Sequence, residues 1–146
     1  MPTDIHAMLM QQEGSGPTKD GRFYPYADAV GKMTIGYGRC LDAKGISTNE
    51  AMMLFNADIA DALDDVRHVC SIYDHLSRAR QLVLISLAYN LGREGLNGFV
   101  RFLGAVHRDA WDEAADELVD SKAAKQAPVR YHQLADMMRT NVSVWL

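Results

Sequence analysis

Apolar residues recur at helical spacing at the start of the chain and again from residue 47 onward, and residues 14–46 between these two regions follow a different pattern. Residues 3–12 are predicted to form a short amphipathic helix that Thr3 or Asp4 can cap, and its apolar face carries Ile5, Met8 and Leu9. Gly14 is a natural helix stop, so the pattern places Glu13 at the C-terminal end of this helix, just before the chain turns.

Residues 14–46 have a different character, because glycine and proline alternate there with aromatic and β-branched residues. This pattern predicts a small antiparallel sheet with tight turns. The turn centres are predicted at Lys19-Asp20-Gly21 and at Val30-Gly31-Lys32.

A long helix is predicted over residues 47–70. Ser47-Thr48-Asn49-Glu50 is a capping-box pattern at its start. The face predicted to be buried carries Phe55, Ile59, Leu63, Val66 and Cys70, and aspartates occupy the opposite, solvated face.

The remainder of the chain is predicted to be helical. Ser77 caps a strongly apolar central helix, whose core segment is 82–91, and Gly92 and Gly95 break it. Further helices are predicted over 97–107, after a cap at Asp109, and from Pro128 to about Arg139. The residues expected to be buried in them include Phe99, Phe102, Leu103, Val106, Trp111, Leu118, Val119, Leu134 and Met138.

The predicted fold class is α+β, mainly α, in two lobes of one domain spanning residues 1–146. The N-lobe covers about residues 13–58 and carries the sheet, and the connecting helix covers about 47–70. The C-lobe covers about 71–146 and includes the N-terminal helix. A ligand is expected in a cleft between the lobes.

Composition narrows the function classes. The net charge is −4, and the basic residues are scattered among acidic ones, which argues against a nucleic-acid binder. The N-terminal segment lacks the pattern of a secretory signal, and the longest apolar run, 82–91, is too short to span a bilayer. We therefore expect a protein made in a cytoplasm without stable membrane insertion, a monomer by default, with Cys40 and Cys70 as unpaired thiols.

Candidate chemistry lies in the segment that precedes the long helix. Glycoside hydrolysis needs one carboxylic acid to protonate the leaving oxygen and a second carboxylate to assist attack, and Glu13 and Asp28 are candidates. Thr34 follows Asp28 by six residues, around the predicted Gly31 turn, so the two side chains could face each other across a hairpin and hold one water. The histidines have no metal-ligand spacing, so no metal or cofactor is expected.

These residues and their surroundings resemble the phage lysozymes, glycoside hydrolase family 24. The resemblance rests on Glu13-Gly14, Tyr26-Ala27-Asp28, Gly31 and Thr34-Ile35-Gly36-Tyr37-Gly38, and it continues through nearly the whole chain. Further matching segments are Leu54-Phe55-Asn56-Ala57-Asp58, Asn90-Leu91-Gly92 with Gly95, Gly98 and Phe99, Trp111-Asp112-Glu113-Ala114-Ala115, Gln126-Ala127-Pro128-Val129-Arg130 and Arg139-Thr140.

The resemblance implies a muramidase that hydrolyses the β-1,4 bond between N-acetylmuramic acid and N-acetylglucosamine in peptidoglycan. It implies that Glu13 is the general acid and that Asp28 with Thr34 activates water, with inversion of configuration. It also implies that Arg130 pairs with Glu13 and that Tyr89 and Asn90 contact sugar. The implied role is host cell lysis in the periplasm, after release through a separate membrane hole (a holin).

Two departures from the family pattern stand out. The segment between Glu13 and Tyr26 is longer than usual, so residues 15–25 are predicted to form an extended hairpin or loop. Arg39 stands where the family often has a histidine that pairs with an aspartate of the connecting helix, so we predict an Arg39–Asp58 pair that stays charged at any working pH.

Two alternatives to a hydrolase stay open. One is a catalytically silent peptidoglycan-binding or virion structural protein on the same fold, since a fold does not establish activity. The other is a lytic transglycosylase, which cleaves the same bond without water. The intact set Glu13, Asp28 and Thr34 favours hydrolysis over both.

Overall fold

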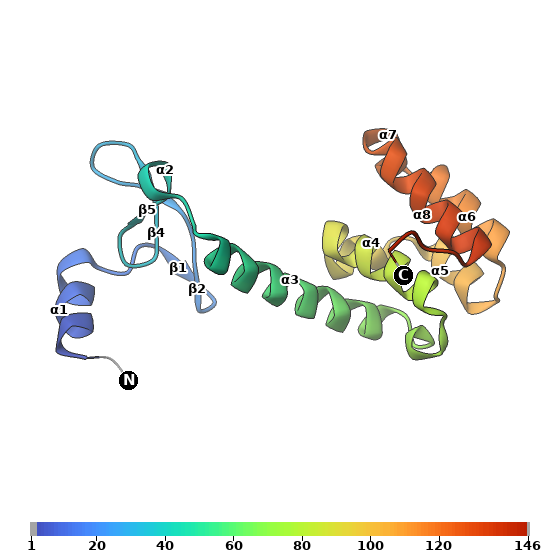
Figure 1. The fold of residues 1–146 in the computed structure, drawn as a ribbon, viewed down its shortest axis with the longest axis horizontal. Helices are drawn as coiled ribbons and strands as arrows, with labels where there is room; N and C mark the ends of the chain where they lie inside the picture. The colour runs from blue at the N-terminus through green and yellow to red at the C-terminus, as the bar shows by residue number, and fades with distance from the viewer. Residues whose placement is uncertain (1–2, 146) are drawn as a thin grey trace. The chain divides into compact units, whose positions relative to one another are not determined.

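The computed structural model describes residues 3–145. The chain divides into two compact units, and the boundary in the sequence falls between Met53 and Leu54, within helix α3 (Thr48–Val69). Figure 1 shows the order of the elements, with the strands preceding α3 and the other long helices following it. The predicted class, mainly helical α+β, is confirmed.

The first unit consists of short elements joined by turns. They are α1 (Asp4–Glu13), β1 (Thr18–Lys19), β2 (Arg22–Phe23), β3 (Tyr26–Ala27), β4 (Met33–Ile35), β5 (Arg39–Cys40), α2 (Leu41–Lys44) and the start of α3. The strands form two antiparallel sheets, one with the order β1-β2 and one with the order β3-β4-β5. In this unit, Thr34 is the one described residue that is buried.

Both predicted turns are confirmed. Asp20 and Gly21 have φ values of 52° and 73°, which is the left-handed pair that a two-residue hairpin loop requires. The 15–25 segment therefore contains a β-hairpin, with Thr18 opposite Phe23. The second turn leads from β3 to β4, and the N–H of Gly31 donates to the carbonyl of Asp28 at 3.0 Å.

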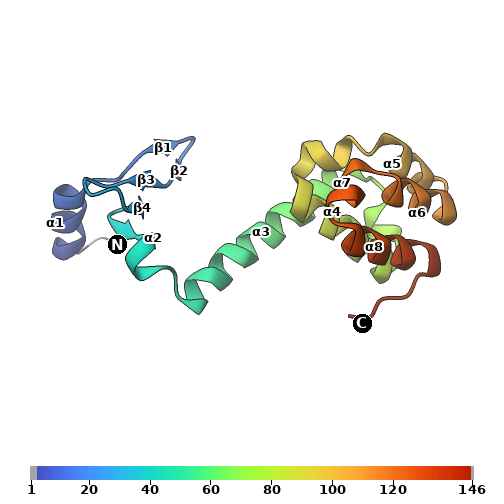
Figure 2. The same ribbon diagram turned by 90° about the horizontal axis from the view of Figure 1, so that it is seen from above.

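The second unit is built around a continuous apolar core. Its elements are the rest of α3, a short 3-10 turn η1 (Tyr73–His75), α4 (Arg78–Asn97), α5 (Val100–His107), α6 (Trp111–Val119), α7 (Lys122–Gln126) and α8 (Pro128–Thr140). Figure 2 shows α4 to α8 gathered into one group of helices. Fully buried side chains of this core include Val66, Val83, Leu84, Leu87, Leu96, Phe102, Val106, Leu118, Tyr131 and Met138.

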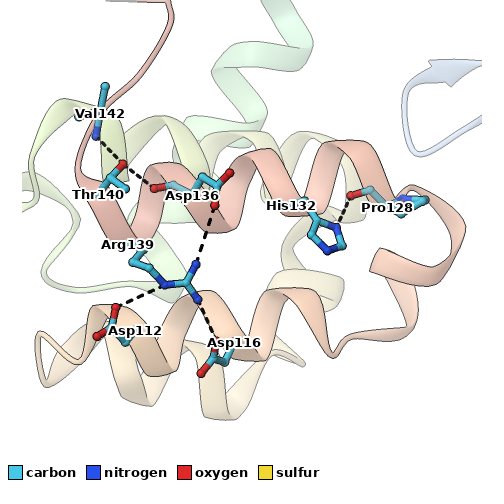
Figure 3. A network of polar contacts seen from close by, with 8 residues as sticks. All are labelled: Asp112, Asp116, Pro128, His132, Asp136, Arg139, Thr140 and Val142. Carbon is cyan, nitrogen blue, oxygen red and sulfur yellow. Dashed lines mark hydrogen bonds and ion pairs between the residues drawn. The ribbon is translucent and has the colours of Figure 1, made fainter.

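Charged side chains connect the helices at the surface of this core. Arg139 of α8 forms ion pairs with Asp112 and Asp116 of α6 and with Asp136 of its own helix (Figure 3). The guanidinium of Arg80 lies 3.8 Å from the centre of the Trp111 ring, and its Nε donates to the carbonyl of Met138. These contacts link α4, α6 and α8 to one another at the surface. The burial of apolar side chains beneath them stabilises the core.

The start of α3 follows the predicted capping box, but its predicted apolar face is only half buried. The Ser47 hydroxyl accepts from the Glu50 N–H at 3.1 Å, and the Ser47 N–H donates to the Glu50 carboxylate at 2.7 Å. Val66 and Cys70 are buried as predicted, whereas Phe55 and Ile59 are exposed. The periodicity correctly identified which side of α3 is apolar. How much of that side other helices cover depends on tertiary packing, which the periodicity does not predict.

Three further details of the helical region differ from prediction. Gly92 breaks the helix as predicted, with φ 73°, but Gly95 stays helical. Asp109 does not cap α6: it has φ 54° and ends α5, because its N–H donates to Val106 and the N–H of Ala110 donates to Ala105, as in a Schellman motif. The separate helix α7 was not predicted.

Cys40 is half buried and Cys70 is buried, and both are free thiols, as expected. None of the helices within residues 3–145 combines the length and the apolar character that crossing a membrane requires.

Candidate active site

Glu13 is the last residue of α1, and its carboxylate lies against the connection between β4 and β5. The contact point is Gly38: a Cβ built on this glycine would lie 3.2 Å from Oε2 of Glu13 and 3.6 Å from its Cβ. Gly38 also has φ 90°, a conformation that other residues rarely adopt. The carboxylate therefore occupies the space that a side chain at position 38 would fill.

The segment after Glu13 packs back onto the three-stranded sheet. A Cβ built on Gly16 would lie 2.5 Å from Cε1 of the Tyr26 ring and 3.3 Å from the carbonyl oxygen of Gly36. Since Tyr26 is in β3 and Gly36 follows β4, this contact holds the chain that leaves α1 against the sheet. Glu13 and the residues that follow it therefore both pack against the β3-β4-β5 sheet.

Asp28 lies at the turn between β3 and β4 and shapes that turn. Its Oδ1 accepts from the N–H of Val30 at 2.9 Å and from the N–H of Lys32 at 2.8 Å. Its own N–H donates to the carbonyl of Lys32 at 2.8 Å. These bonds fix the carboxylate to the backbone of the turn and engage one of its two oxygens.

Thr34 is in the middle of β4 and is 4% exposed. Its hydroxyl donates to the carbonyl of Lys32 at 3.1 Å. Thr34 lies opposite Tyr26 in the strand register, and Asp28 follows Tyr26 by two residues. Asp28 and Thr34 therefore share one face of the hairpin, as diagonal neighbours rather than directly opposite ones.

Arg39, the residue after Gly38, has a different partner from the predicted one. Its Nη1 and Nη2 donate to the two oxygens of Glu50 at 2.8 and 2.6 Å, and Nη1 also donates to the carbonyl of Gly45. The prediction of Asp58 as its partner is wrong. The capping box with Ser47 holds the Glu50 carboxylate next to β5, where both of its oxygens accept from the Arg39 guanidinium.

This ion pair changes the pKa values of both partners. The hydrogen bond from Arg39, together with the one from the Ser47 backbone, lowers the pKa of Glu50 from 4.5 to about 2. The same bond with Glu50 raises the pKa of Arg39 above its ordinary value. The pair therefore stays charged over the whole neutral and mildly alkaline range.

The other three predicted site residues belong to the second unit. Tyr89 is exposed and makes an edge-to-face contact with Phe55, with ring centres 5.9 Å apart, and it lines an open pocket with the aspartates Asp58, Asp61 and Asp65. Asn90 is exposed, two residues before the kink at Gly92. Arg130 is exposed in the first turn of α8 and lines a groove shared with Leu82 and Ser86 of α4.

The phage lysozyme family model matches residues 18–133 of this chain. The chain belongs to the phage lysozyme family. It is also similar to a protein described as "Probable T4-type lysozyme 1" from Dictyostelium discoideum, with 25% identity over 169 aligned positions that cover 96% of each chain.

As a phage lysozyme, the protein is a glycoside hydrolase of the type that acts on peptidoglycan. The match to the family model includes Asp28, Thr34, Tyr89, Asn90 and Arg130, while Glu13 precedes its first residue. The grouping of Glu13 with Asp28 and Thr34 in one unit therefore adds a geometric argument that the family match does not supply.

Two features of this phage lysozyme were not found from the sequence. The first is the contact between Glu13 and Gly38, for which the only signal was the repeated glycine of Gly36-Tyr37-Gly38. The second is a contact between the rings of Phe23 and Tyr37, whose centres are 5.4 Å apart. Both contacts join segments that are more than ten residues apart, so a local pattern cannot predict them.

Proposed function

We propose that this phage lysozyme hydrolyses the β-1,4 bond between N-acetylmuramic acid and N-acetylglucosamine, with Glu13 as the general acid. The observation that carries the proposal is that the carboxyl groups of Glu13 and Asp28 and the hydroxyl group of Thr34 all lie at the β3-β4-β5 sheet. Glu13 contacts the β4–β5 connection at Gly38, Thr34 is in β4, and Asp28 is at the β3–β4 turn.

In this proposal Glu13 protonates the glycosidic oxygen while water attacks from the opposite face of the sugar. The free oxygen of Asp28 accepts a proton from this water, and the Thr34 hydroxyl orients it. Diagonal neighbours on a hairpin are about 7–8 Å apart, which leaves room for one water between their side chains. Attack by a water held in this way inverts the configuration at the anomeric carbon.

The helical unit is proposed to supply substrate contacts. The exposed Tyr89 and Asn90 would contact sugar, and Arg130 would pair with Glu13 and orient its carboxyl group. We also propose the division of one domain into an N-lobe, a connecting helix and a C-lobe, with α1 belonging to the C-lobe. Exposed apolar side chains on α1, namely Ile5, Met8 and Leu9, support its packing against another surface.

The test compares the native protein with Glu13→Gln in clearing outer-membrane-permeabilised Gram-negative cells. Glutamine keeps the shape of the side chain and removes the acid, so the clearing rate should fall by about 10²–10⁴-fold. Glu94→Gln, at an exposed glutamate of α4, is the matched control and should clear cells at the native rate. Circular dichroism checks that each variant is folded.

Other outcomes would overturn the proposal in distinguishable ways. A product with an anhydro sugar end, detected by mass spectrometry, would identify a lytic transglycosylase. Binding to purified peptidoglycan without any cleavage would identify a catalytically silent protein. Full activity in Glu13→Gln would leave the enzyme a hydrolase but would remove Glu13 from the mechanism.

We propose host cell lysis as the biological role, with release to the wall through a separate membrane hole. Family membership supports this role. Expression in bacteria should leave the culture intact until the inner membrane is permeabilised, and lysis should then follow quickly. Lysis without permeabilisation would contradict the need for a separate hole.

A further inference from the structure

Two aromatic side chains lie in contact at the surface of the first unit. The rings of Phe23 and Tyr37 have centres 5.4 Å apart and planes inclined by 59°. Phe23 is 39% exposed and Tyr37 is 47% exposed, so neither ring belongs to a core. Apolar side chains that gather at a surface, instead of occurring singly, are typical of a binding site.

Backbone turns bring the two aromatic residues together. Phe23 ends β2, and its position opposite Thr18 is set by the two-residue turn at Asp20 and Gly21. Tyr37 lies between Gly36 and Gly38, which have φ values of 65° and 90°. The 15–25 hairpin, the segment that departs from the family pattern, therefore brings a ring to the β4–β5 connection.

This aromatic pair adjoins the proposed acid. Tyr37 immediately precedes Gly38, and Gly38 is the residue against which the Glu13 carboxylate lies. Tyr37 therefore lies one residue along the chain from the contact of the proposed acid. The aromatic contact joins two rings, and an apolar surface of this size suits one ring of a ligand better than a broad protein interface.

We propose that Phe23 and Tyr37 form an aromatic platform on which one N-acetylhexosamine ring of the glycan strand stacks, next to the bond that is cleaved. The apolar C–H face of a pyranose ring packs on an aromatic face, and the tyrosine hydroxyl can hydrogen-bond a sugar hydroxyl. The β1–β2 hairpin is then a substrate-binding element of this enzyme. This inference rests on the proposed function of Glu13.

The platform binds substrate and does no chemistry, so its removal should affect KM and leave kcat nearly unchanged. The variants are Phe23→Ala, Tyr37→Ala and the double variant, assayed on dye-labelled peptidoglycan sacculi. Each single change is expected to raise KM by about tenfold, the size expected for loss of one aromatic contact. Phe23→Tyr and Tyr37→Phe keep a ring and should restore most of the binding.

Binding is measured separately from cleavage by co-sedimentation of the Glu13→Gln protein with purified Gram-negative sacculi. Adding Phe23→Ala or Tyr37→Ala to this background should weaken binding by the same factor as the rise in KM. Met53→Ala, at an exposed apolar residue of the same unit, is the control and should change neither value.

The outcomes separate this inference from the proposed function. Unchanged KM and unchanged sedimentation in the folded platform variants would overturn the platform while leaving the muramidase intact. A fall in kcat at constant KM would also overturn it, because the rings would then position Glu13 and not substrate. Full activity in Glu13→Gln would remove Glu13 from the proposed mechanism, and with it the argument that places the platform next to the acid.

Discussion

The two units of this protein are stabilised in different ways. From Leu54 onward, apolar side chains from α3 to α8 share one core, in which Leu84, Leu87 and Phe102 are almost inaccessible to water. In the first unit, by contrast, turns and hydrogen bonds determine the structure, and Thr34 is the one buried residue among those described. The candidate catalytic groups all lie in this sparsely buried unit.

The difference shows how a site of polar groups can be ordered without a core of its own. Asp28 accepts hydrogen bonds from two backbone N–H groups of its turn. Glu50 accepts hydrogen bonds from the Arg39 guanidinium and from the Ser47 N–H. Each of these carboxylates is therefore part of the local fold. In the helical unit a truncation should cost stability, whereas in the first unit it should mainly cost activity.

The largest expected effect tests the contrast with one substitution made in both units. Phe102→Ala removes a fully buried ring and should lower the free energy of unfolding by about 3–5 kcal/mol. Phe23→Ala removes a ring that is already partly in water and should cost about 1 kcal/mol or less. Urea unfolding followed by circular dichroism measures both, and equal losses would contradict the contrast.

The next prediction separates catalysis from turn formation at Asp28. Asp28→Asn keeps an oxygen that can accept from Val30 and Lys32 but removes the base, so activity should fall by about 10²–10⁴-fold with little loss of stability. Asp28→Ala should lose the same activity and, in addition, about 1 kcal/mol of stability. An Asn variant with native activity would restrict Asp28 to a structural role.

Elements with a local physical cause could be predicted from the sequence. The hairpin at Asp20-Gly21, the capping box of Ser47 with Glu50 and the helix that Ser77 caps all depend on residues within four positions of one another. The segment that carries Asp28 and Thr34 was correctly predicted as a hairpin for the same reason, although their diagonal relation depends on the register.

Features that depend on competition between equivalent groups could not be predicted. Arg39 could pair with several carboxylates along α3, and the capping geometry of Glu50 decides the choice. Asp109 is a favoured residue type at a helix start and only occasionally adopts the left-handed conformation of a helix end, yet the hydrogen bonds to Val106 and Ala105 place it at the end of α5. The contact between Glu13 and Gly38 is a tertiary close approach without any local signal.

A smaller effect is expected at Gly38, and Gly36 provides its control. Alanine at either position must adopt a positive φ and should cost about 1–2 kcal/mol of stability. At position 38 the new methyl group would also lie 3.2 Å from Oε2 of Glu13, whereas at position 36 it would meet open space. Displacement of the carboxylate should lower kcat of Gly38→Ala by about 10–100-fold.

Gly36→Ala should keep most of the native activity in the same assay on sacculi. Equal activity losses in the two variants would assign the effect to backbone strain and not to the position of Glu13. Equal retention of activity would show that the carboxylate can move without consequence, which would weaken the proposed role of its contact with Gly38.

The smallest expected effect is the pH dependence of the Arg39–Glu50 pair, which links the strands of the first unit to α3. The pKa of Glu50 is lowered to about 2, so the pair contributes its full stability above pH 4.5 and loses it as the pH falls from 4.5 towards 2. The difference in unfolding free energy between the native protein and Glu50→Gln should therefore be constant from pH 5 to 8 and shrink below pH 4. Both side chains are partly exposed, so the difference itself should be modest and should decrease with added salt.

Because Arg39 keeps its charge in mildly alkaline solution, a loss of stability just above neutral pH that disappears in Arg39→Met would contradict this account.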